Sequence, residues 1–324
     1  MTLVKKPICL VALCLSIGAV SCGGEEETTE EPVCDTDTNA APAPPIVSIT
    51  PSEPTTSEAL VAKLVEASVD PDEDPVTPKI KWFKNGEEQT DYESQLEIPA
   101  DATTKGELWK VEIAGFDGQT EGYPGGAQVT IANTLPTATA SLTPEAPTTI
   151  EDLVVTLVGE DIDGDQVGGT YAWSKNGAPY VDDDGAAITG SILSSEHTTR
   201  GDTWQVIVTP NDGEDDGADI VLSTSIANAL PVLDATMIAL DPANANADTD
   251  LSVTISSLGV SDADGDSVQF SYVWQVDGVT LGDETGSSLS SARFGAGETV
   301  TVSVTPYDGY DYGLAVTKSL TIGN

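Results

Sequence analysis

A short acidic loop occurs three times in the chain, and each copy leads into a segment that carries a tryptophan. The loops are Asp70-Pro71-Asp72-Glu73-Asp74, Asp161-Ile162-Asp163-Gly164-Asp165 and Asp262-Ala263-Asp264-Gly265-Asp266. Trp82, Trp173 and Trp274 each lie twelve positions after the first aspartate of their loop. Carboxylates at alternate positions around a turn offer the oxygen ligands that a hard cation such as Ca²⁺ prefers. The first chemistry that the sequence suggests is therefore calcium binding.

These loops are not EF-hands, and a Ca²⁺ ion would need further oxygens from elsewhere. The twelfth loop position, where an EF-hand has a bidentate glutamate, holds Lys81, Ala172 or Val273. A second turn, of sequence Asp-Gly, follows later in every copy and offers another carboxylate. The candidate metal ligands are Asp70, Asp72, Asp74, Asp117, Asp161, Asp163, Asp165, Asp212, Asp262, Asp264, Asp266 and Asp308.

A simpler interpretation of the same loops stays open. Aspartate and glycine are favoured turn residues, and Asp-Gly closes a hairpin without any metal. The acidic loops are then solvated turns. The sequence does not decide between the two interpretations.

The segments around the loops alternate between apolar and polar residues, as β-strands do. Leu60, Ala62 and Leu64 are expected on the buried face of an early strand. A later segment places Trp109 and Val111 on one face. Asn-Gly or Asp-Gly at 85–86, 176–177 and 277–278 predicts a tight hairpin. The same features recur at intervals of 95 and 96 residues, measured between Asn133, Asn228 and Asn324.

About seven short strands per repeat predict an all-β chain of three tandem immunoglobulin-like β-sandwiches. The pattern resembles bacterial immunoglobulin-like repeats of the PKD and cadherin-like kind, over about residues 46–324. The first copy departs from it, with Pro71 and Glu73 inside its loop. In this topology the two acidic turns lie at the end where the chain enters from the preceding repeat. As in cadherin-like proteins, Ca²⁺ held there would stiffen the array.

The N-terminus has the parts of a bacterial lipoprotein signal in order. Lys5 and Lys6 precede an apolar run that ends in Ala19-Val20-Ser21-Cys22-Gly23. This resembles a lipobox, which implies lipidation at Cys22. Gly23, in place of aspartate, favours the outer membrane or cell surface. The alternative is an ordinary secretory signal that happens to contain a cysteine.

These patterns divide the chain into five parts. A signal peptide spans residues 1–21, and a lipid-anchored, disordered acidic tether spans 22–45. The three immunoglobulin-like repeats span 46–134, 135–229 and 230–324. The acidic residues and prolines of the tether predict an extended spacer without a core.

The composition excludes several functions. A formal net charge of −42, with 12 Lys plus Arg against 54 Asp plus Glu, is incompatible with binding nucleic acid phosphates. No nucleophile elbow, phosphate loop or zinc-protease motif occurs, which argues against an enzyme. His197, the single histidine, is expected at the surface. The five tryptophans are expected in the cores rather than as stacking platforms for sugars.

The sequence therefore predicts a non-enzymatic, lipid-anchored cell-surface protein that acts as a Ca²⁺-stiffened stalk or adhesion protein. Its partners would be the membrane and an extracellular protein or polysaccharide. The alternative is a module that binds extracellular polysaccharide or peptide. A cluster of Tyr307, Tyr310 and Tyr312 is the one aromatic group that fits this alternative. The preferred role for that cluster is packing against the second repeat.

Overall fold

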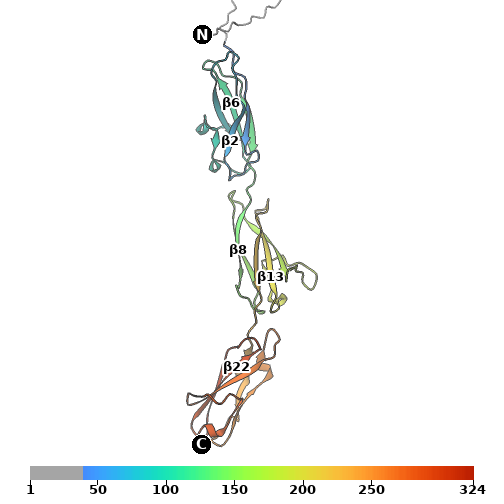
Figure 1. Cartoon of the computed structure of the whole chain (residues 1–324), viewed down its shortest axis with the longest axis vertical. Helices are drawn as coiled ribbons and strands as arrows, with labels where there is room; N and C mark the ends of the chain where they lie inside the picture. The colour runs from blue at the N-terminus through green and yellow to red at the C-terminus, as the bar shows by residue number, and fades with distance from the viewer. Residues whose placement is uncertain (1–38) are drawn as a thin grey trace, which may run out of the picture.

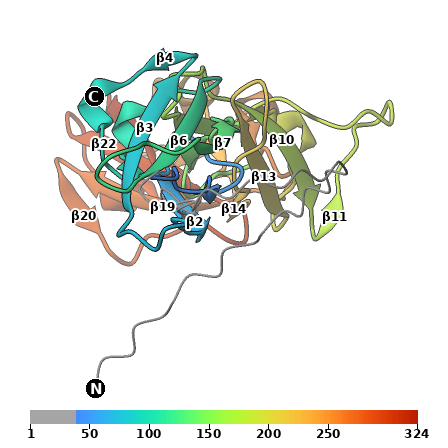
Figure 2. The ribbon, with the colours of Figure 1, turned by 90° about the horizontal axis from the view of Figure 1, so that it is seen from above.

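The computed structural model describes residues 39–324, which form an all-β protein. Three sandwiches follow one another along the longest axis (Figure 1). They overlap when the chain is seen from above (Figure 2). The signal peptide, Cys22 and residues 22–38 of the tether lie outside the described residues.

Each repeat consists of a three-stranded sheet and a four-stranded sheet, both antiparallel. In repeat 1 the first sheet has the order β1-β2-β5 and the second β4-β3-β6-β7. Their bounds are β1 Ile46–Thr50, β2 Leu60–Glu66, β3 Thr77–Lys84, β4 Glu87–Glu88, β5 Glu97–Ile98, β6 Leu108–Phe116 and β7 Gly125–Thr130. In immunoglobulin notation the orders are A-B-E and C′-C-F-G, which is the predicted sandwich.

Repeats 2 and 3 have the same two sheets. Repeat 2 comprises β8 Thr137–Thr143, β9 Leu153–Glu160, β10 Gly168–Lys175, β11 Ala178–Pro179, β12 Ile192–Leu193, β13 Thr203–Asn211 and β14 Ile220–Ser225. Repeat 3 comprises β16 Ile238–Asp241, β17 Leu251–Ile255, β19 Gln269–Val276, β20 Val279–Leu281, β21 Ser288–Leu289, β22 Thr299–Tyr307 and β23 Val316–Thr321, with an added pair, β15 Val232–Leu233 and β18 Val260–Ser261. Short 3₁₀ helices are η1 Thr90–Tyr92, η2 Ala100–Ala102, η3 Ser195–His197, η4 Ala235–Met237, η5 Ser257–Gly259 and η6 Ser291–Arg293.

The predicted hairpin turns form at all three positions. Asn85 and Gly86 have φ angles of 51° and 88°, and Asp277 and Gly278 have 47° and 79°. Two consecutive residues with positive φ make the tight turn that matches the twist of the flanking strands. This turn joins the central strand of the larger sheet to its short edge strand in every repeat.

The tryptophans lie in the cores, as predicted. Trp82 and Trp274 have no exposed surface, and Trp173 is 4% exposed. Each donates its indole N–H to a backbone carbonyl at 2.9 Å, so the polar atom of the ring is satisfied inside the sandwich. Trp82 packs edge-to-face against Trp109 at 6.3 Å, a contact that Trp173 and Trp204 repeat.

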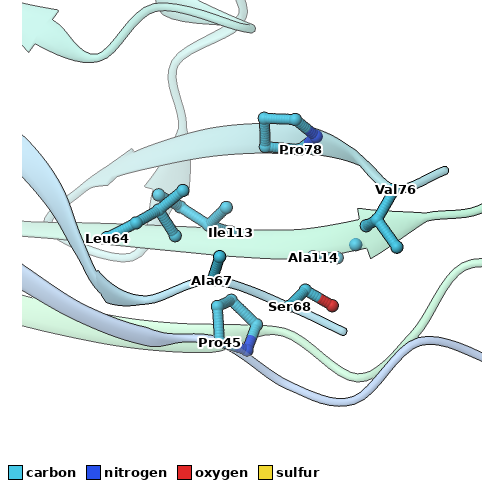
Figure 3. Close-up of a pocket in the computed structure, with 9 residues that line it drawn as sticks. Pro45, Leu64, Ala67, Ser68, Val76, Pro78, Ile113 and Ala114 are labelled. Carbon is cyan, nitrogen blue, oxygen red and sulfur yellow. The ribbon is translucent and has the colours of Figure 1, made fainter. Parts of the chain in front are cut away.

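Leu64 departs from the predicted alternation. Leu60 and Ala62 are buried, but Leu64 is 40% exposed. It lines a small surface pocket of about 180 Å³ together with Pro45, Val76 and other residues (Figure 3). The C-terminal end of β2 therefore extends beyond the packed core.

Candidate functional site

The first aspartate of each acidic loop holds the loop in shape. Asp161 accepts hydrogen bonds at Oδ1 from the backbone N–H groups of Asp163 at 2.8 Å and Asp165 at 3.3 Å. Asp70 and Asp262 make the same pair of bonds in their own loops. The local sequence therefore folds each loop into a turn capped by its own carboxylate, as expected for aspartate.

The other oxygen of the same aspartate has no donor among the described residues. Asp70 Oδ2, Asp161 Oδ2 and Asp262 Oδ2 are buried and accept no hydrogen bond from residues 39–324. Asp70 as a whole is 4% exposed. A buried carboxylate oxygen without a donor is costly unless a cation neutralises it. The same atom is orphaned in all three copies, so the cause lies in the shared loop.

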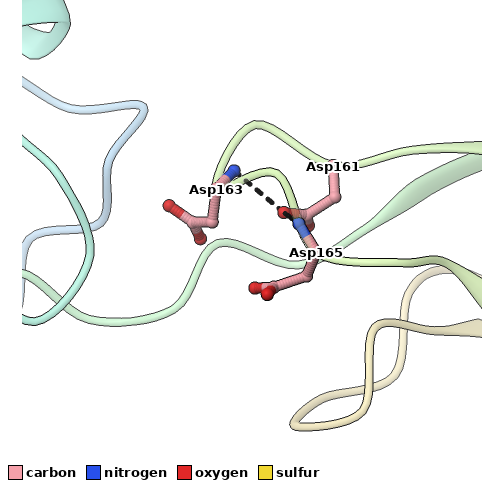
Figure 4. A group of neighbouring side chains, drawn as sticks. All are labelled: Asp161, Asp163 and Asp165. Atoms are coloured by element: carbon pink, nitrogen blue, oxygen red, sulfur yellow. Dashed lines mark hydrogen bonds between the residues drawn. The ribbon is translucent and has the colours of Figure 1, made fainter.

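In two copies the three carboxylates converge. Asp161, Asp163 and Asp165 each offer an oxygen, and these oxygens lie within 4.8 Å of one another (Figure 4). Asp262, Asp264 and Asp266 form the matching group in repeat 3. Within residues 39–324, Asp70, Asp72 and Asp74 do not form such a group. At the turn of that loop, Glu73 adopts a positive φ of 68°, where the other two loops have glycine.

The preceding repeat grips the middle aspartate. Asp163 accepts hydrogen bonds from the Thr134 N–H at 2.7 Å and from the Thr56 hydroxyl. Both donors belong to repeat 1. Asp264 accepts the equivalent bonds from Ala229 N–H and Thr149, at 2.8 Å and 2.7 Å. The acidic loops of repeats 2 and 3 therefore lie at the junctions with the preceding repeats.

The later acidic turn reaches the same junction but is already satisfied. Asp212 accepts from the N–H groups of Asp215 and Glu214 at Oδ1 and from Asn133 Nδ2 at Oδ2. The bonds from Asp215, Asn133 and Glu214 lower the pKa of Asp212 to about 2. Asp212 contributes to the junction by binding Asn133, and it lies outside the converging carboxylate groups of the described chain.

Asp308 and Asp117 behave in the same way. Asp308 accepts from Asn228 Nδ2 at 2.7 Å, and Asp117 accepts from Asn39 Nδ2 at 2.8 Å. Burial alone would raise the pKa of Asp308, but the hydrogen bonds from Asn228 and the backbone outweigh it, and the pKa is lowered. In every repeat the aspartate of this turn therefore accepts a hydrogen bond from an asparagine in the segment that leads into the repeat.

Two basic residues, which the sequence analysis did not single out, enter the junctions. The Lys105 ammonium donates to Asn133 Oδ1 at 3.0 Å, to Glu214 Oε1 at 2.8 Å and to Asp165 Oδ2. Hydrogen bonds from Lys105 to Asp165 and Glu214 raise the lysine pKa. Its position could have drawn notice, because it directly precedes Gly106, in a segment that recurs in every copy.

Arg200 takes the equivalent place in the second junction. Its Nη1 donates to Asn228 Oδ1 at 2.7 Å and to Asp266 Oδ2, and its Nη2 donates to Asp266 Oδ1 at 3.3 Å. The guanidinium also lies 3.9 Å from the centre of the Tyr310 ring. The bond to Asp266 raises the pKa of Arg200. Tyr310 thus contacts repeat 2, as the sequence analysis favoured for its cluster, while Tyr307 and Tyr312 pack on each other.

His197 is not the simple surface residue that was expected. It is half-buried, and its Nδ1 lies 3.1 Å from the Tyr180 hydroxyl. Tyr180 in turn packs on Trp204. The polar sequence around His197 gave no sign of this aromatic neighbour, which comes from the hairpin after the central strand.

No family model and no curated protein matches the chain. Among solved structures, the three N-terminal domains of the bacteriophage RB49 highly immunogenic outer capsid protein are similar, at 17% identity and a TM-score of 0.31, covering 86% of this chain and 98% of that one. The N-terminal eight immunoglobulin domains of Down syndrome cell adhesion molecule align at 11% identity and a TM-score of 0.23, covering 87% of this chain and 48% of that one. At these scores the fold assignment rests on the strand order given above.

Within residues 39–324, no helix has the length and apolar character needed to cross a membrane.

Proposed function

We propose that the protein is a non-enzymatic, lipid-anchored cell-surface protein whose three sandwiches form a Ca²⁺-stiffened stalk or adhesion module. The observation that carries the Ca²⁺ part is the buried oxygen on Asp70, Asp161 and Asp262 that finds no donor within residues 39–324. An oxygen in this state at the same position of three loops fits a cation ligand better than a chance defect of packing.

The residues present suit a hard divalent cation. Asp161, Asp163 and Asp165 would hold it in the first junction, and Asp262, Asp264 and Asp266 in the second. Bound there, Ca²⁺ would neutralise clustered carboxylates whose middle member is also fixed by the preceding repeat. The chain's own part is to bring the three carboxylates together and to tie the loop to the neighbouring repeat through Thr134 or Ala229.

The anchor and the location rest on the N-terminal sequence. The run ending at Cys22 has the order of a lipoprotein signal, and the acidic segment after it would space the sandwiches from the membrane. Metabolic labelling with a palmitate analogue tests this, since a Cys22→Ser variant is expected to lose the label and its place in the membrane fraction.

Binding of an extracellular peptide is the second candidate, and one feature favours it. A crevice of about 620 Å³ at the second junction is lined largely by apolar residues, among them Ile150, Val232 and Leu314. Leu314 is 85% exposed and Ile150 is 66% exposed. An apolar crevice of this size is typical of a binding surface.

Thermal unfolding of the mature chain in EDTA, Mg²⁺ or Ca²⁺ tests the Ca²⁺ proposal. Millimolar Ca²⁺ on a site with a Kd of about 10 µM stabilises by about 2.7 kcal/mol. We expect an upward shift in Tm that Mg²⁺ does not reproduce and that Asp161→Asn with Asp262→Asn removes. Asp182→Asn is the matched control, because Asp182 caps a turn with the same two backbone bonds but lies outside the junctions. Absence of any Ca²⁺-specific shift would reject calcium stiffening.

A further inference from the structure

Each junction contains one cationic side chain, which belongs to the preceding repeat and donates hydrogen bonds to several oxygen atoms. Lys105 donates to the side-chain oxygen Oδ1 of Asn133, to Asp165, the last aspartate of the next loop, and to Glu214. Arg200 donates to Asn228 and to Asp266, which is the last aspartate of the following acidic loop. The two cations come from equivalent positions, and each binds the equivalent asparagine and the equivalent aspartate.

The negative charge at the junctions favours these contacts. The formal net charge is −42, and the first junction gathers Asp161, Asp163, Asp165 and Glu214 in a small volume. Carboxylates at such distances repel one another unless a cation lies between them. Lys105 and Arg200 are 22% and 25% exposed, so solvent screens them less than it screens an ordinary surface ion pair.

We propose that Lys105 and Arg200 are resident counter-cations that lock the two junctions and hold neighbouring repeats in a fixed orientation without bound metal. This inference rests on the proposed stalk, but not on its calcium. It assigns the metal-independent part of the stiffness to two side chains and leaves the orphaned Asp161 and Asp262 oxygens for a divalent ion.

Repeat 3 shows that the fold itself does not need the cation. Parallel bridges pair Thr55 with Ala132, Thr148 with Ala227 and Asn246 with Gly323, which makes the ends of the three repeats equivalent. At the positions of Lys105 and Arg200, repeat 3 has Ala296, and at the positions of Thr56 and Thr149 it has Ala247. The sandwich forms with alanine at both contact positions, so the lysine and arginine serve the junctions.

The facing residue differs between the junctions in a matched way. Lys105 pairs with the carboxylate of Glu214, whereas Arg200 lies over the ring of Tyr310. Glu214 and Tyr310 occupy the same turn position, two residues after Asp212 and Asp308 respectively. A point charge faces a charge, and a planar guanidinium faces a ring, as the chemistry of the two cations favours.

Distances between spin labels in EDTA test the lock on the whole mature chain, in a Cys22→Ser and Cys34→Ser background. Labels at Gln128→Cys, Ser223→Cys and Ser319→Cys lie on exposed, equivalent positions of the last strand of each repeat. We expect narrow distance distributions in the otherwise unchanged chain. Lys105→Met should broaden the 128–223 distribution alone, and Arg200→Met should broaden the 223–319 distribution alone.

Matched variants make the outcome decisive. Lys105→Arg keeps the charge and should keep the narrow distribution, and Lys63→Met removes an exposed lysine from β2 and should change nothing. Narrow distributions in Lys105→Met and Arg200→Met would overturn the proposal. So would an unchanged chain that is broad in EDTA and narrows only with Ca²⁺. A chain that is narrow in EDTA but shows no Ca²⁺-specific shift in Tm would support the lock while rejecting the calcium part of the proposed function.

Discussion

The two junctions share a frame of hydrogen bonds to aspartates, but they differ in the residues around that frame. In both, a threonine hydroxyl and a backbone N–H bind the middle aspartate of the next loop, and an asparagine binds the later turn. The cation is Lys105 at the first end and Arg200 at the second. The constant part is therefore a set of bonds to carboxylates, and the variable part lies at the rim of the junction.

The rim differs in polarity as well as in charge. The crevice at the second junction is lined by Ile150, Val232 and Leu314. The corresponding positions at the first junction are Ser57, Thr137 and Ala218. One frame thus carries a polar rim in one place and an apolar rim in the other, which is what duplication followed by divergence at exposed positions would produce.

The largest expected effect comes from removing the shared part of the frame. Asp163→Ala and Asp264→Ala each delete two hydrogen bonds to a carboxylate and leave a backbone N–H without an acceptor. The side chain of Asp264 is 2% exposed, so water replaces these bonds poorly. Each variant should lose about 3 kcal/mol of unfolding free energy, from two charge-assisted bonds. Urea unfolding of the mature chain measures this loss.

The loss should be at least as large for Asp264→Ala as for Asp163→Ala, because both aspartates accept the same two hydrogen bonds and Asp264 also lies 3.7 Å from Arg200 Nη1. Asp183→Ala, at the tip of an exposed turn, is the control and should leave stability unchanged. If one variant lost much unfolding free energy and the other lost none, the same hydrogen bonds would contribute differently to stability at the two junctions.

A second, intermediate effect concerns Glu107 and Asp202, which lie two positions after Lys105 and Arg200 respectively. Glu107 accepts the indole N–H of Trp109 at 3.0 Å, whereas the Trp204 indole N–H is buried and has no acceptor in the described part of the chain. Asp202 stands where repeat 1 has Glu107 and is shorter by one methylene. Asp202→Glu should therefore stabilise the chain by about 1 kcal/mol, because it satisfies a buried donor.

The reciprocal change, Glu107→Asp, should destabilise repeat 1 by a similar amount. Asp202 also accepts from Asn176 Nδ2 and Thr199 N–H and pairs with Lys175, and the longer side chain must keep enough of these contacts. Thermal unfolding of both variants compares the two repeats directly. Destabilisation by Asp202→Glu would mean that the contacts of Asp202 outweigh the unsatisfied indole.

The sequence predicted the parts of this architecture that depend on local patterns. Alternation located the strands, Asn-Gly and Asp-Gly located the hairpins, and the spacing of Trp82, Trp173 and Trp274 located the cores. It also brought the two acidic turns of each repeat to one end. These features follow from side-chain period and turn chemistry, which are written within a few residues.

The contacts of the cations could not be predicted in that way. Lys105 is 60 residues from Asp165 and 109 from Glu214, so only the folded junction makes them neighbours. The later turn is expected to supply metal ligands, and that stays a prediction. In the structure Asp212 and Asp308 accept hydrogen bonds from Asn133 and Asn228. The sequence pattern placed both carboxylates at the end of the repeat where the chain enters, and the tertiary structure decided which donor each one meets.

The smallest expected effect separates the two rims by their response to salt. Glu214→Ala removes an ion pair in which the glutamate is 59% exposed, and Tyr310→Ala removes a ring that is 62% exposed beneath Arg200. Each should cost about 0.5 kcal/mol at low ionic strength. Double-mutant cycles with Lys105→Met and Arg200→Met isolate the pairwise energies from other effects of the substitutions.

The two coupling energies should diverge as salt is added. The Lys105–Glu214 coupling should fall toward zero at about 1 M salt, where the Debye length is about 3 Å. The Arg200–Tyr310 coupling should persist, because stacking of a weakly hydrated guanidinium on a ring includes dispersion that salt does not screen. Equal salt dependence in both cycles would mean that Tyr310 acts through the charge of its surroundings rather than through its ring. The difference between the two rims would then be one of composition alone.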